Sequence, residues 1–463
     1  MGEKDKKEEM GAGSYHVESP ERIVYDYHGD VEMVKAGALP ALVQHLTRHD
    51  KLDASFNRTF LTTYRYFTTG AELLQHLLER FDCEPPLGSS PEDAAAWINE
   101  IQPLIRLRVV NVLRQWLESF WIEPEGTETH KTLLAVQLFA GELSATESGA
   151  VQQLLEIIRC RLAGVERTKR SQPSISNPPK PILPRKLSKL QFLKIDAKEI
   201  ARQLTLMEAS MFGKLQFSEL LNKNWQRKEN SNGTSLAPNV RALIRYFNQL
   251  SSWVNALILA ESDLKKRTQV IGHLINVANE CHMLQNYSVV VSILSGLEST
   301  PIYRLGRTWA MVTERSCKIL EPLQALISSD QNYLVYRDTV RRALPPCIPF
   351  LGLFLKDLVF IEDGNAATSP EGFINISKYT MLASTIHEVQ RFKQASYSLL
   401  PVPELQEYLA TQLQSAGDVY EMWQRSCELE PRGRGDESRL RDTYTATGGM
   451  TTSMVVACMV LDD

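Results

Sequence analysis

Two adjacent carboxylates, Glu362 and Asp363, are the first candidates for chemistry, because they end an almost wholly apolar stretch at residues 345–365. Pro349 stands where a first helical position would be, and Gly364 where a helix would stop. Carboxylates at the C-terminal end of a helix oppose its dipole, so this placement costs stability and indicates a use. The alternative interpretation is a buried core helix whose acidic end faces water.

The rest of the sequence carries no familiar catalytic or cofactor motif. No glycine-rich phosphate loop is present, and there is no HExxH and no Cys/His cluster with metal-ligand spacing. The seven cysteines are scattered and form no CxxC pair, which is typical of reduced thiols in an intracellular protein. Basic residues are not interleaved with aromatic ones, so we expect no nucleic-acid partner, no metal and no cofactor.

Length and charge limit the classes of protein further. A chain of 463 residues has room for two or three domains, and its formal net charge of -4 gives no drive toward anionic partners. No apolar run reaches the roughly 18 residues that a membrane span needs. The N-terminus is too charged for a signal peptide, and Lys6 departs from the myristoylation pattern. We expect a cytoplasmic protein recruited to a membrane surface only indirectly, and its abrupt start suggests part of a longer chain.

Helical periodicity dominates the elements that must position these residues. Apolar residues recur at helical spacing in sets such as Leu39, Leu42, Val43 and Leu46, and Leu73, Leu74, Leu77, Leu78 and Phe81. Thr69 and Glu72 form a capping-box pair ahead of the second set. No stretch shows convincing period-two alternation, so the sequence predicts an all-α fold without strands.

Changes in composition divide the chain into five parts. We expect disorder at 1–20, a helical domain at 21–164, a Pro-rich basic linker at 165–187, a larger helical domain at 188–430 and a disordered tail at 431–463. In the second domain, a partner helix that begins near Glu371 would pair with the apolar helix as a hairpin. Residues 178–184 of the linker fit either a plain connector or the ligand of a proline-reading domain. The linker's basic charge also allows weak contact with acidic lipid.

Four motifs resemble one known family. Residues 57–67 (NRTFLTTYRYF) are similar to the Ras exchanger motif, and three others are similar to the catalytic domain of Ras-family guanine-nucleotide exchange factors, such as Son of sevenless. The three are 201–208 (ARQLTLME), 301–305 (PIYRL) and 345–350 (PPCIPF). The resemblance runs from about residue 21 to about residue 430. It implies an all-helical exchanger-motif domain that supports an all-helical catalytic domain.

The resemblance gives the acidic helix end a role. In this family, the helical hairpin pries switch 1 of the GTPase away from its nucleotide, and one apolar residue and one carboxylate reach the magnesium and phosphate site. By motif match these are Val359 and Asp363. They are four residues apart and therefore share one helix face. The apolar side chain offers no ligand to Mg²⁺, and the carboxylate repels phosphate.

Further GTPase-binding positions carry over by the same match. Four residues resemble the apolar surface that grips switch 2: Trp225, Tyr303, Leu305 and Phe350. Arg245 matches a polar contact to the GTPase. Trp309 resembles an aromatic anchor near this surface or a core residue, and Arg304 matches a recurrent residue with a structural role.

Three positions depart from the family pattern. Glu298 stands where Asn is common against switch 2, Lys356 where Thr is usual on the hairpin, and Met381 where Son of sevenless has Lys. We expect Glu298 and Lys356 to face the GTPase, so these differences bear on the choice of partner.

The resemblance therefore implies an exchange factor that promotes GDP release from a Ras-family small GTPase without covalent chemistry. Two alternatives stay open. One is a non-catalytic helical scaffold that binds a GTPase, and the other is exchange on a Rap-like GTPase.

Overall fold

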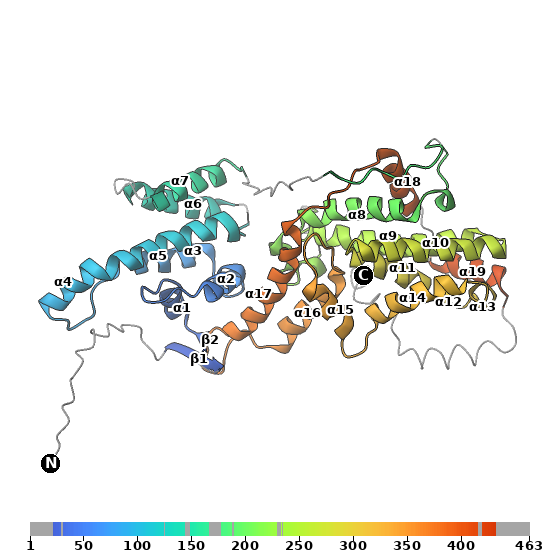
Figure 1. The fold of residues 1–463 in the computed structure, drawn as a ribbon. Coiled ribbons are helices and arrows are strands. Elements are labelled where there is room, and N and C mark those ends of the chain that lie inside the picture. The colour runs from blue at the N-terminus through green and yellow to red at the C-terminus, as the bar shows by residue number, and fades with distance from the viewer. Residues whose placement is uncertain are drawn as a thin grey trace, which may run out of the picture. The chain divides into compact units, whose positions relative to one another are not determined.

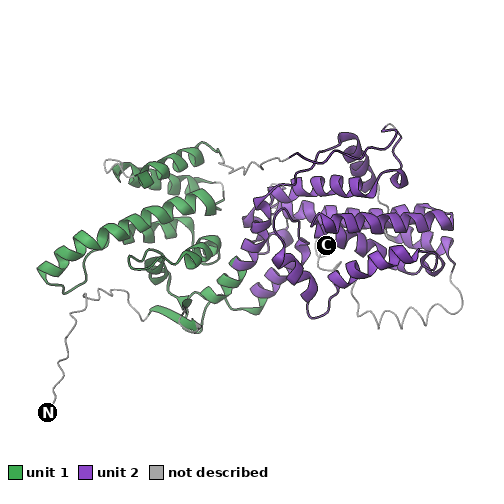
Figure 2. Cartoon of the chain, in the orientation of Figure 1, with its two compact units in different colours: residues 1–169, 363–383 green, residues 170–362, 384–463 purple. Residues whose placement is uncertain are grey.

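The computed structural model describes residues 22–28, 31–124, 126–143, 149–165, 177–187, 189–228, 233, 235–414 and 419–431. Helices make up most of these residues, which confirms the all-α prediction (Figure 1). The disorder predicted for residues 1–20 and for the tail after residue 431 falls outside the described residues. The chain forms two compact units, residues 1–169 with 363–383 (unit 1) and residues 170–362 with 384–463 (unit 2) (Figure 2).

Unit 1 is a bundle of short helices around α5. Its helices are α1 (Leu39–Leu46), α2 (Ala54–Thr63), α3 (Gly70–Phe81), α4 (Pro91–Glu100), α5 (Gln102–Gln115), α6 (Thr127–Glu142) and α7 (Gly149–Leu162). Helix α5 packs against α3, α4 and α7. The predicted cap of α3 is present, since the Thr69 hydroxyl accepts the Glu72 N–H at 3.2 Å.

The expectation that the chain has no strands is wrong at the start of unit 1. Strands β1 (Ile23–His28) and β2 (Val31–Gly37) pair in antiparallel fashion. Val34 and Ala36 point into the core while Lys35 is exposed, so β2 does follow a period of two. In β1 the alternation of buried and exposed residues is interrupted, because Tyr27 is exposed. Two short strands also give a weaker periodic pattern in the sequence than long amphipathic helices do.

Residues 363–383 join unit 1 through the edge of this small sheet. Gly37 and Ile374 exchange two backbone hydrogen bonds, with N···O distances of 3.1 and 2.9 Å. Helix α17 (Ile376–Arg391) therefore begins after this bridge and not near Glu371 as expected. The Asn375 side chain accepts the Lys378 N–H at 3.3 Å and so caps the first turn of α17.

Unit 2 is built around the buried helix α11 (Tyr287–Leu297). Its other helices are α8 (Ala197–Lys214), α9 (Pro238–Ala260), α10 (Leu264–Met283), α12 (Thr300–Tyr303), α13 (Gly306–Trp309), α14 (Glu314–Ile327), α15 (Leu334–Arg342), α16 (Leu351–Gly364), α18 (Pro403–Gln414) and α19 (Val419–Leu429), with part of α17. Every residue of α11 is buried, and the helix packs against α9 and α10. None of the helices in the described residues is both long and apolar enough to cross a lipid bilayer.

Gly296 sets the close approach of α11 to α9. A Cβ atom at this position would lie 2.7 Å from Val254 Cβ and 2.8 Å from the Ser251 carbonyl oxygen. Backbone and a β-branched side chain cannot move aside easily, so only glycine fits without displacing one helix. The packing of unit 2 therefore depends on the absence of a side chain here.

We expect Gly296→Ala to lower the free energy of unfolding by roughly 1–3 kcal/mol, because the added methyl group overpacks this contact. Urea unfolding of the purified protein measures the change. The control is Gly213→Ala near the end of α8, where no atom lies within 4 Å of the added Cβ. The control should be neutral or stabilising by up to about 1 kcal/mol. Equal stability of the two variants would contradict this role of Gly296.

Candidate functional site

Helix α16 leaves the core of unit 2 part-way along its length. Residues 351–355 and Leu358 are buried, whereas Val359 is only partly buried. Phe360 is 63% exposed, and Asp363 is exposed in the last turn. The helix is therefore buried in its first turns and exposed at its acidic end, as both interpretations of Asp363 expect, and Val359 is partly accessible on the same face.

Helix α15 holds the buried ends of both hairpin helices. The Arg337 guanidinium makes two bonds to the Asp357 carboxylate on α16, at 2.6 and 2.9 Å. Arg391, at the end of α17, donates to the carbonyl oxygen of Arg341 at 3.2 Å. The Tyr336 hydroxyl accepts the Phe350 N–H at 2.6 Å, just before α16 begins. The base of the hairpin is thus fixed by charge-assisted bonds that leave little freedom of rotation.

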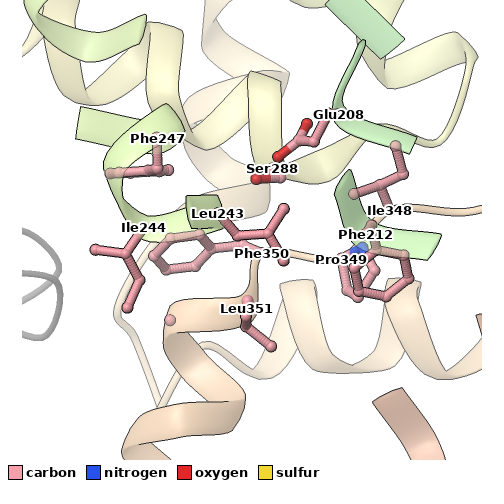
Figure 3. Close-up of a pocket in the computed structure, with 11 residues that line it drawn as sticks. Glu208, Phe212, Leu243, Ile244, Phe247, Ser288, Ile348, Pro349, Phe350 and Leu351 are labelled. Carbon is pink, nitrogen blue, oxygen red and sulfur yellow. The ribbon is translucent and has the colours of Figure 1, made fainter. Parts of the chain in front are cut away.

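Phe350 lines a small cavity near the base of the hairpin. Its ring contacts Phe247 of α9, with ring centroids 5.0 Å apart (Figure 3). Gly352 makes room for the ring, because a Cβ there would lie 2.4 Å from Phe350 Cζ. The cavity measures about 20 Å³, enough for one water molecule. Figure 3 shows the Glu208 carboxylate beside the Ser288 hydroxyl at the polar end of this space.

Glu208 is a buried carboxyl group without full compensation. Burial raises its pKa to about 7, although hydrogen bonds from Ser288 and Asn286 oppose the increase. No described protein atom bonds to its Oε2. The environment therefore favours the neutral acid, and a water molecule in the adjoining cavity could complete its hydrogen bonds.

The predicted switch 2 surface is partly exposed and partly buried. Trp225, Leu305 and Phe350 are all buried. Tyr303 is 43% exposed, and Arg245 is exposed on α9. In this conformation the three buried side chains can only support a contact surface, and the two exposed ones can form it.

Trp309 and two of the three departures from the family pattern, Glu298 and Lys356, already have partners within the chain. The Trp309 indole N–H donates to the Ile302 carbonyl oxygen at 3.0 Å, which ties the side chain to its own segment. Glu298 accepts a bond from Gln324 at 3.1 Å, and burial raises the pKa of Glu298. The Lys356 ammonium lies 5.6 Å from the centroid of the Phe360 ring, one turn along α16.

The outer part of the hairpin contacts an aromatic cluster within unit 1. The Tyr379 ring lies 5.4 Å from that of Tyr66 and 5.1 Å from that of Phe67. Ser377 lies beside β2, where its hydroxyl donates to the Lys35 carbonyl oxygen at 3.5 Å. The segment 57–67, noted in the sequence as a motif, thus supplies two of the rings that hold α17.

Comparison with known proteins identifies both parts of the chain. Residues 199–380 match the family model of the RasGEF domain, and residues 33–139 match that of the RasGEF N-terminal motif. The chain belongs to the RasGEF family.

The RasGEF relatives are longer than this chain. The chain is 30% identical to Cell division control protein 25 of Saccharomyces cerevisiae over 461 residues, which cover 94% of this chain and 28% of that protein. It is 33% identical over 407 residues to Ras guanine nucleotide exchange factor J of Dictyostelium discoideum, covering 87% of this chain and 48% of that protein. The chain therefore spans less than half the length of either relative.

The sequence did not reveal one polar cluster of this RasGEF. Glu430, after α19, accepts the backbone N–H groups of Arg307 and Thr308 at 2.9 and 3.0 Å. Arg304 donates to the Glu430 carbonyl oxygen at 2.7 Å and to that of Ser426 at 2.8 Å. These bonds hold α19 on α12 and α13, as a structural role for Arg304 would require. No local signal marks Glu430, because its partners are more than 100 positions away in the sequence.

In the part of the RasGEF chain that the structure describes, no group of three His, Cys, Asp or Glu residues could hold a metal ion.

We expect Glu208 to contribute stability that is lost as pH rises from 4.5 to 7. Its pKa is raised from 4.5 to about 7 in the folded state, so the folded protein binds more protons than the unfolded chain in this window. The free energy of unfolding therefore decreases as pH rises, by up to roughly 3 kcal/mol from this group.

Urea unfolding at pH 4.5, 6 and 8 tests the Glu208 prediction. Glu208→Gln should flatten the pH dependence, because an amide does not ionise. Glu404→Gln, at an exposed position on α18, serves as the control and should keep the wild-type slope. An unchanged slope in Glu208→Gln would show that the carboxyl group ionises freely.

Proposed function

We propose that this chain is a guanine-nucleotide exchange factor for a Ras-family small GTPase. The observation that carries the proposal is helix α16, which is buried at its base, where Arg337 binds Asp357, and which is partly accessible at Val359 and exposed at Asp363. The names of the RasGEF relatives support the same activity. No covalent chemistry and no cofactor take part, and contact with a membrane comes through the GTPase.

The hairpin acts as a wedge at switch 1. Val359 enters the magnesium site and offers the ion no ligand, while Asp363 repels the phosphates of the nucleotide. To displace switch 1, the hairpin must keep its own conformation when the GTPase is bound. The Arg337–Asp357 pair at the base stabilises that conformation, as do the contacts of Tyr379 farther out.

Switch 2 is held by a separate surface. Tyr303 and Arg245 contact the GTPase directly, because both side chains are exposed. Trp225, Leu305 and Phe350 form the apolar floor beneath this surface and keep its shape. Such a division is common at interfaces, where a packed core supports a few exposed anchors.

The energies require both contacts. A picomolar nucleotide complex corresponds to roughly 16 kcal/mol, and about 10⁵-fold faster release needs a barrier lower by roughly 7 kcal/mol. One exposed carboxylate cannot supply that amount. Binding of exchanger and nucleotide must weaken each other equally, so the energy that lowers the barrier comes from the switch 2 surface and the wedge together.

Two alternatives differ from this proposal in a measurable way. A non-catalytic scaffold would bind nucleotide-free GTPase without accelerating release, and the unusual Glu298 and Lys356 favour it. Exchange on a Rap-like GTPase is the second alternative. Release of labelled GDP from a panel of purified Ras-like and Rap-like GTPases separates all three. No acceleration with any member would overturn the exchange proposal.

We expect Asp363→Asn to slow GDP release about fivefold, roughly 1 kcal/mol in the barrier, because repulsion of the phosphates is lost. Stopped-flow release of labelled GDP at saturating exchanger measures the rate. The matched control is Glu362→Gln, which removes the neighbouring charge from a different helix face. Equal rates for the two variants would mean that only net charge matters and that Asp363 has no specific role.

We expect Tyr66→Ala to lower the maximal release rate about fivefold, because α17 loses one of its aromatic supports in unit 1. The concentration of exchanger that gives half-maximal release should change little, since the switch 2 grip is intact. The same titration yields both quantities.

The control for Tyr66 is Phe139→Ala, which removes another partly buried ring of unit 1. Phe139 contacts Phe81 with ring centroids 4.9 Å apart and touches no hairpin residue in the described contacts. Both variants should lose similar stability, but only Tyr66→Ala should slow release. If both variants slowed GDP release equally, the effect would come from general destabilisation of unit 1 and not from lost support of α17.

A further inference from the structure

The end of the Pro-rich linker is seated on unit 2 in a regular way. Between residues 177 and 187, every third residue is partly buried, namely Pro178, Pro181, Pro184 and Leu187, and all the others are exposed. A polyproline II helix has roughly three residues per turn, so these four residues share one face. The strap, as we call residues 177–187, therefore lies with one face against the unit.

The sequence of the strap favours this conformation before any contact forms. Each proline fixes its own φ angle and restricts the residue before it to extended geometry. Of residues 177–184, only Ile182 is neither a proline nor followed by one. Little conformational entropy is therefore lost when the strap binds a surface.

Two hydrogen bonds from α8 hold the strap at its middle. The Glu199 carboxylate accepts the Ile182 N–H at 2.9 Å, and the Arg202 guanidinium donates to the Lys180 carbonyl oxygen at 3.2 Å. Both side chains are buried, and they pair with each other at 3.1 Å. The strap thus completes the hydrogen bonds of a buried ion pair.

The same pair connects to the segment before α18. Gln203 donates to Glu199 at 2.7 Å and to the Leu400 carbonyl oxygen at 3.0 Å, and it accepts the Val402 N–H at 3.0 Å. Because the network reaches three segments, its strap-facing atoms are rigidly placed. The surface of α8 that contacts the strap, which we call the seat, is therefore an ordered part of the fold.

We propose that residues 181–186 are the ligand of an SH3-type proline-reading domain, and that the seat on α8 competes with that domain for the same prolines. The stretch Pro181-Ile-Leu-Pro184-Arg-Lys186 has the pattern P-x-x-P-x-K. Such domains pack aromatic grooves on the two prolines of the pattern. Pro181 and Pro184 are the residues that face unit 2, so the two contacts exclude each other.

Charge and exposure favour this partner over a plain connector. Arg185 and Lys186 are both exposed at the end of the pattern, where a partner's acidic residues can reach them. Ile182 and Leu183 are exposed too, at 39% and 54%, which a connector does not need. This proposal does not depend on exchange activity, because it concerns a different surface and a different partner.

Competition predicts weaker binding by the intact chain than by the free strap. If the strap is released about one tenth of the time, the apparent affinity falls about tenfold. The probe is a purified SH3 domain that binds P-x-x-P-x-K peptides, and its ligands are the full chain and a synthetic peptide of residues 177–187. Isothermal titration should show about tenfold tighter binding to the peptide.

Two proline substitutions separate the seat from the ligand. Ile182→Pro removes the N–H that Glu199 accepts and keeps both prolines and Lys186, so chain and peptide should then bind equally well. Leu183→Pro adds the same ring one position along and leaves the bond to Glu199, so the tenfold difference should persist. Each variant chain is compared with the peptide of its own sequence, which cancels direct effects on the SH3 contact.

Three results would overturn the proposal. Failure of the SH3 domain to bind the wild-type peptide would remove the partner. Equal affinity for the wild-type chain and peptide would remove the competition. A difference that survives in Ile182→Pro would show that the bond to Glu199 does not hold the strap. A thermal unfolding curve is recorded for each variant chain. A midpoint that is unchanged within a few degrees excludes global unfolding as the cause of these results.

Discussion

The candidate site depends on one apolar helix, α16, that is buried at its start and exposed at its end. Helix α16 buries its first turns in unit 2 and exposes Phe360 and Asp363 in its outer half, so its direction depends on what holds its base. The Arg337–Asp357 pair and the bond of Arg391 to the end of α15 provide that hold at the base. A helix that tilts freely could not displace part of a bound partner, because the helix would move and the partner would not.

Buried polar groups show where the fold is tightly specified. Glu199 and Glu430 are fully engaged, each joining segments far apart in the sequence. Glu208 differs, since one of its oxygen atoms has no described protein partner and burial raises its pKa to about 7. Satisfied networks define a single arrangement, whereas the raised pKa of Glu208 makes the stability of unit 2 depend on protonation of this carboxyl group.

Both units are assembled from segments that are far apart in the sequence. Unit 1 includes residues 363–383, and unit 2 includes the strap as well as the two ends of the hairpin. The strap on α8 and Tyr66 beside α17 are two cases in which a helix is contacted by a segment distant in the sequence.

The sequence alone determined the all-α class, the apolar α11, the cap at Thr69 and the family, because these follow from local periodicity and from motifs of contiguous residues. It also indicated Val359 and Asp363, which share a helix face by spacing. It did not determine β1 and β2, the start of α17 or the burial of Trp225 and Leu305. Only the tertiary structure decided these, since edge pairing, exposure and partners such as Glu430 depend on chain segments that meet only after folding.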